Sequence, residues 1–146
     1  MKEINREMKT KTWVELIIDE FPFTPDEMSS RLGLKPSASE RKGDIKVLPR
    51  GKSLIEPFNT WKLESGCDSK TTLQDQIKEL LNKMRPYKEK FIPVCREFPP
   101  DVNVVIHMYS SEVSPYIGWD NNVMKELADY NASWGIDLSV YGEDDE

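Results

Sequence analysis

The sequence predicts an α+β domain in a ferredoxin-like or split βαβ arrangement, with a mostly antiparallel sheet and helices packed on one face. Two strand–helix–strand patterns support this prediction, one at residues 12–65 and one at residues 102–141. A longer amphipathic helix at residues 71–92 joins these two halves. Because 146 residues is an ordinary domain length, we expect a single domain over residues 1–146. Its ordered core should cover about residues 12–142, between a flexible N-terminus and a flexible acidic C-terminal tail.

The first half opens with a strand at residues 12–19, where apolar side chains alternate along the chain. A helix start follows. Thr24 is a favourable N-cap residue, Pro25 suits the first helical position, and Glu27 completes a capping box. Gly33 is a natural residue for the end of this short helix.

Residues 35–58 predict a long loop, because proline and glycine recur along them; a short strand is expected at residues 45–48. Six basic residues and only two acidic ones lie between residues 35 and 52. The strand at residues 60–65 that closes this half places Trp61 and Leu63 on one face.

The linking helix carries a stripe of leucine and isoleucine, and Thr71 with Gln74 forms a second capping box. The strand at residues 102–109 is apolar on both faces, so we expect it inside the sheet. Asp120 caps the next helix, and a last strand follows at residues 136–141. On that strand we expect three side chains to point inward: Ile136, Leu138 and Val140.

Charge and composition exclude several classes of protein. The net charge of −6 argues against nucleic acid as the main partner, because nucleic-acid binders usually carry a basic surface. The chain has no apolar run long enough to span a membrane and no apolar signal core near its N-terminus. The two cysteines suit reduced thiols, so we expect a cytoplasmic protein without a membrane partner.

Catalytic patterns are missing from the sequence. His107 is the only histidine, and neither a nucleophile elbow nor a cysteine–histidine signature accompanies it. Cys95 precedes Arg96, a cation that would lower a thiol pKa, although most isolated cysteines are inert. We therefore expect no catalytic residues, no metal site and no cofactor, and we favour a protein without enzymatic activity.

The basic loop offers one candidate ligand site. Ser37 and Ser39 hydroxyls, with the Arg41 and Lys42 cations, would bind an anion, while Trp61 on the adjoining strand would supply an aromatic wall. The alternative is a solvated loop whose cations pair with nearby carboxylates.

A second candidate is an interaction surface at Tyr116, Ile117 and Trp119, since these side chains lie in a proline-containing loop.

Several short runs of residues stand out along the chain: Leu32-Gly33-Leu34-Lys35-Pro36, Arg41-Lys42-Gly43-Asp44, Trp61-Lys62-Leu63 and Ile136-Asp137-Leu138-Ser139-Val140-Tyr141. Together these runs resemble the DUF4279 family of small bacterial domains. The resemblance implies a stand-alone bacterial α+β domain with no established activity, and it carries over no catalytic residues. Small acidic domains of this sort include immunity proteins that neutralise toxins.

These observations favour a small cytoplasmic binding domain with a protein partner, an immunity-type protein being one form of it. The alternative is a small-molecule binding protein, or an enzyme, that uses the loop at residues 35–52 beside Trp61 for an anionic ligand. The oligomeric state is left open.

Overall fold

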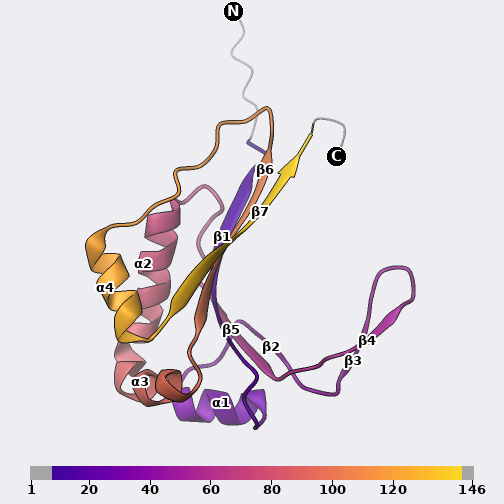
Figure 1. The fold of residues 1–146 in the computed structure, drawn as a ribbon, viewed down its shortest axis with the longest axis vertical. Helices are drawn as coiled ribbons and strands as arrows, with labels where there is room; N and C mark the ends of the chain where they lie inside the picture. The colour runs from indigo at the N-terminus through magenta and orange to yellow at the C-terminus, as the bar shows by residue number, and fades with distance from the viewer. Residues whose placement is uncertain (1–7, 143–146) are drawn as a thin grey trace, which may run out of the picture.

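A computed structural model describes residues 8–142; residues 1–7 of the predicted flexible N-terminus and residues 143–146 of the acidic tail lie outside this range. It shows a five-stranded sheet with the helices on one side (Figure 1). The elements in chain order are β1 (Lys11–Asp19), α1 (Pro25–Leu32), β2 (Ala38–Glu40), β3 (Ile45–Val47), β4 (Ser53–Ile55), β5 (Thr60–Glu64), α2 (Leu73–Met84), the 3-10 helix η1 (Arg85–Tyr87), α3 (Lys88–Glu97), β6 (Asp101–Tyr109), α4 (Asn121–Asp129) and β7 (Ser133–Tyr141).

The strand order is β2-β5-β1-β6-β7, and every neighbouring pair except β6–β7 is antiparallel. This confirms the predicted α+β class and the mostly antiparallel sheet. The order also refines the ferredoxin-like expectation. β1 and β5 are direct neighbours, and so are β6 and β7, so the strands of the two halves lie side by side and are not interleaved.

The core lies between the sheet and the helices. On β1, Val14, Leu16 and Ile18 are fully buried, as the alternation predicts. The apolar stripe of α2 meets them from the helix layer. The remaining fully buried side chains come from all parts of the chain and include Met28, Leu32, Trp61, Ile77, Leu80, Leu81, Phe91, Val102, Val104, Ile106 and Tyr130.

The helix starts in the structure differ from the predicted ones in one detail. The Thr24 hydroxyl accepts a hydrogen bond from Glu27 N, which confirms the first cap. The linking helix begins one residue later than predicted, because Thr72 is its N-cap and accepts from Asp75 N. The Thr71 carbonyl instead accepts a hydrogen bond from the buried Gln76 amide.

The last strand corrects a prediction. β7 starts at Ser133, three residues before the expected position, and its supposedly inward side chains are exposed. Ile136, Leu138 and Val140 do lie on the helix side of the sheet, because they are register partners of the buried row on β6. No helix covers them within residues 8–142, since α4 packs against α2 and not over the edge strand.

Parts of the predicted loop at residues 35–58 form the short strands β2, β3 and β4. β3 and β4 pair as a two-stranded antiparallel hairpin, which projects away from the body of the domain (Figure 1). We refer to residues 45–55 as the β3–β4 arm. At its base, the two flanking segments are joined by hydrogen bonds from Gly43 N to Glu56 O and from Glu56 N to Asp44 O.

Candidate functional site

The residues of the predicted anion site are spread along β2 and not gathered at one point. Ser37 lies at one end of β2, where its hydroxyl accepts a hydrogen bond from Glu64 N at 2.8 Å. Lys42 lies beyond the other end, where its backbone N–H donates to Asn59 Oδ1. Between them, Ser39 is the register partner of Trp61.

Arg41 and Trp61, two residues of the predicted anion site, interact with other side chains of the protein. The Arg41 guanidinium lies 3.7 Å from the Asp26 carboxylate of the neighbouring helix. Trp61 is completely buried, its indole N–H donates to the Ser29 hydroxyl at 3.1 Å, and its ring packs edge-on against Phe91. The indole therefore presents no face to a ligand outside the core.

Cys95 is also buried, and burial raises the pKa of its thiol to about 12. The Arg96 effect considered from the sequence is therefore overridden by desolvation, because a thiolate is disfavoured away from water. Within residues 8–142 there is also no group of three or more histidine, cysteine or acidic side chains placed to hold a metal ion.

The predicted interaction residues lie beside β7. Tyr116 and Ile117 are exposed in the connection from β6 to α4. Trp119 packs edge-to-face against Trp134 at a ring-centroid distance of 4.8 Å, and its indole N–H points at the sulfur of Met124. Sequence reasoning missed Trp134, which joins this connection to the edge strand.

The edge strand carries a continuous apolar row. Trp134, Ile136, Leu138 and Val140 occupy alternate positions, so they share one face of β7. Their exposed fractions are 41–56%, although the register partners of Ile136 and Leu138 on β6 are fully buried. We refer to these four residues and Trp119 as the β7 edge surface.

The same four β7 residues present free backbone groups. Ser133 N donates to Pro100 O, and Tyr141 O accepts from Ser110 N, so the odd-numbered residues direct their amides towards β6. Because successive residues of a strand point their backbone polar groups to opposite sides, the even-numbered residues direct theirs to the free edge. No strand pairs with that edge in the part of the chain that the structure describes. It therefore offers a row of hydrogen-bond donors and acceptors as well as apolar side chains.

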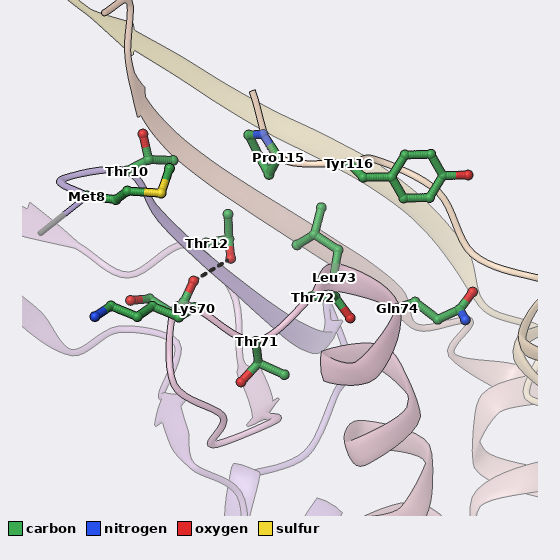
Figure 2. Close-up of a pocket in the computed structure, with 11 residues that line it drawn as sticks. Met8, Thr10, Thr12, Lys70, Thr71, Thr72, Leu73, Gln74, Pro115 and Tyr116 are labelled. Atoms are coloured by element: carbon green, nitrogen blue, oxygen red, sulfur yellow. Dashed lines mark hydrogen bonds between the residues drawn. The ribbon is translucent and has the colours of Figure 1, made fainter. Parts of the chain in front are cut away.

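A cavity of about 570 Å³ lies on the other side of the β6–α4 connection (Figure 2). Its walls come from the start of β1, the N-terminus of α2 and the connection: Met8, Thr10, Thr12, Ser69, Lys70, Thr71, Thr72, Leu73, Gln74, Pro115 and Tyr116. The Thr12 hydroxyl donates a hydrogen bond to Ser69 O, which is the dashed line in Figure 2. It also accepts a hydrogen bond from the side-chain amide of Gln76. Such a cavity has the size of a small-ligand site.

Two carboxyl groups meet at the base of the β3–β4 arm. A hydrogen bond between the Glu40 and Glu56 side chains is the main cause of both their shifts, raising the pKa of Glu56 and lowering that of Glu40. Lys62 lies 3.6 Å from Glu40 and supports its ionised form. This side-chain hydrogen bond links the base of the arm to the main sheet.

None of the described helices is long and apolar enough to cross a membrane. Comparison with known proteins found no match among curated proteins and none among solved structures. The family model described as "Domain of unknown function (DUF4279)" matches residues 8–141, nearly the whole chain. The chain therefore belongs to the DUF4279 family.

Proposed function

We propose that this protein is a binding domain that docks another polypeptide on the β7 edge surface. One observation carries the proposal: a nine-residue edge strand leaves four large apolar side chains and a row of backbone amides uncovered. Natural proteins usually protect such an edge with charges, proline, bulges or a covering segment, because an open edge pairs with other chains. β7 has only one charged residue, Asp137, and its side chain points to the other face.

The charge of the protein supports a partner with basic groups. The chain carries a net charge of −6, and complementary charge speeds and orients association. An immunity-type protein, which blocks a toxin by binding it, is the narrower form of this proposal.

A photo-crosslinking experiment tests the docking surface directly. A photoreactive residue is placed at Leu138 on the β7 edge surface, and in a second variant at Ser139, the next residue on the opposite face of the same strand. The full chain is crosslinked in its native cells, and the attached peptides are sequenced. We expect polypeptide adducts from position 138 and few from position 139. Equal labelling at the two positions, or none at position 138, would refute the proposal.

Small-molecule binding is the second candidate function, and the cavity of Figure 2 is the observation that favours it. If the ligand is an anion, the alternative site is the basic loop at residues 35–52. Leu73→Trp would fill the cavity, whereas Arg41→Ala/Lys42→Ala removes the loop cations. A thermal-shift screen of nucleotides, phosphosugars and sulfate on both variants separates these sites. A ligand that stabilises the wild type and both variants equally would exclude both.

A further inference from the structure

The β3–β4 arm is a second unprotected apolar feature of this chain. Ile45 and Ile55 are register partners, and Val47 lies two residues along the same face. All three side chains are 65–73% exposed. A two-stranded hairpin is marginally stable by itself in water. Because the arm shows three branched aliphatic side chains to solvent, it lacks a packing partner among residues 8–142.

The arm and the end of the chain carry opposite charges. Residues 45–55 contain three basic side chains, Lys46, Arg50 and Lys52, and no acidic one. Residues 133–146 contain five acidic side chains and no basic one: Asp137, Glu143, Asp144, Asp145 and Glu146. A segment with strand structure, alternate apolar residues and positive charge is what the β7 edge surface would bind, and the chain itself contains one.

The arm of one molecule cannot reach the β7 edge surface of the same molecule. It leaves the sheet between β2 and β5, whereas β7 forms the opposite edge. Neighbouring strands are about 4.8 Å apart, so β2 and β7 are about 19 Å apart across four strand spacings. Figure 1 shows the arm directed away from the body of the domain.

We propose that the β3–β4 arm of one copy of this chain docks on the β7 edge surface of a second copy. This inference rests on the proposed function, because it names the polypeptide that occupies that surface. The aliphatic face of the arm covers the apolar row of β7, and the lysines and arginine of the arm carry the charge opposite to that of residues 133–146. Direct β7–β7 pairing would offer no opposite charges, because residues 133–141 contain Asp137 and no basic residue.

Two double variants test this contact. Ile45→Lys/Val47→Lys disables the arm, and Ile136→Lys/Leu138→Lys disables the edge; all four positions are exposed, so each variant should keep its fold. Molar mass is measured by light scattering and sedimentation over a wide range of concentrations. We expect the wild type to form species of two or more copies and each double variant to be monomeric. Leu54→Lys, on the other face of the arm, and Ser139→Lys should associate like the wild type.

Mixing the two double variants tests the arm–edge contact most directly. Each retains the half that the other has lost, so an arm–edge contact predicts one heterodimer from two monomeric proteins. A photoreactive residue at position 138 of the arm variant should capture residues 45–55 of the edge variant. This recovery also shows that both variants are folded. The association should weaken as salt rises, because the Debye length falls from about 10 Å at 0.1 M to 3 Å at 1 M.

Three results would overturn the inference: a wild type that is monomeric at every concentration, an arm variant that still self-associates, or a mixture that forms no heterodimer. Its failure differs from failure of the proposed function. If position 138 crosslinks only to a foreign protein, the binding surface stands and the second copy is the wrong occupant.

Discussion

Replacing Leu138 by alanine should barely change the stability of the monomer, whereas replacing its neighbour Ile106 should change it strongly. The two side chains are register partners on β7 and β6 and lie on the same face of the sheet. Ile106 is 0% exposed and Leu138 is 52% exposed. Their contrast therefore measures whether the helix side of β7 is open in solution.

The expected magnitudes follow from these exposures. Truncating a fully buried isoleucine to alanine costs about 2–5 kcal/mol, because it loses burial and leaves a cavity. Full burial of a leucine is worth about 1.5–3 kcal/mol, so a half-exposed one should lose about 1 kcal/mol, and solvent fills the space. Since 1 kcal/mol shifts Tm by about 2–4 °C in a domain of this size, Leu138→Ala should lower Tm by only a few degrees.

Urea and thermal unfolding of both variants give the measurement, at low protein concentration and again at high concentration. Equal destabilisation by Leu138→Ala and Ile106→Ala at low concentration would show that β7 is covered within one molecule, and the argument for an open edge would fail. A cost of Leu138→Ala that grows with protein concentration is expected if a second copy covers the strand.

Three further predictions concern buried groups. Ser29→Ala leaves the buried Trp61 indole N–H without an acceptor and should cost about 1–3 kcal/mol in urea unfolding, whereas Ser29→Thr keeps the hydroxyl; an alanine variant as stable as the wild type would contradict this. The raised pKa of Glu56 means that its carboxyl stabilises the fold below the unfolded pKa of about 4.3, and that this contribution is lost as pH rises through the higher folded value. Glu56→Gln keeps a hydrogen-bond donor for Glu40 at every pH, so its Tm advantage over the wild type should grow between pH 4 and pH 7; a difference independent of pH would exclude the shared proton. Because burial raises the pKa of Cys95 to about 12, a thiol reagent at neutral pH should label Cys95 only as fast as the protein unfolds, and rapid labelling of the native protein would show that the thiol is accessible.

Local signals in the sequence predicted the elements well. The alternation on β1 and the Thr24 cap act over a few residues, so they can be recognised without knowing the rest of the fold. The N-cap of α2 was predicted at Thr71 but is Thr72, because two adjacent threonines are equally favourable N-cap residues in the sequence. The Thr71 carbonyl accepts a hydrogen bond from the Gln76 side chain instead.

The burial of individual side chains could not be predicted from the sequence, because it depends on which helix covers which strand. The alternation of Ile136, Leu138 and Val140 shows that they share a face, but their burial depends on where α4 packs. The same limit applies to Trp61. Its pattern predicts a strand position, and only the packing of Ser29 and Phe91 around it shows that the indole is enclosed. Tyr116 and Ile117 are exposed as expected, whereas Trp119 is partly buried against the core, and the role of all three in binding stays a prediction.

The size of the apolar surfaces predicts how a self-associated form is built. Four half-exposed side chains on β7 and three more exposed ones on the arm would contribute about 6–12 kcal/mol if fully buried, at about 1.5–3 kcal/mol per complete side chain. The lost translational and rotational freedom costs about 4–15 kcal/mol, so one arm–edge contact is close to balance. Two reciprocal contacts double the gain, while the loss of freedom is incurred once. We therefore expect the wild type to form a symmetric dimer in which the arm of each copy binds the β7 edge surface of the other. The mixed heterodimer has a single contact and should dissociate at much higher concentration than the wild-type pair. Equal dissociation constants for the two, measured by sedimentation, would contradict the reciprocal arrangement.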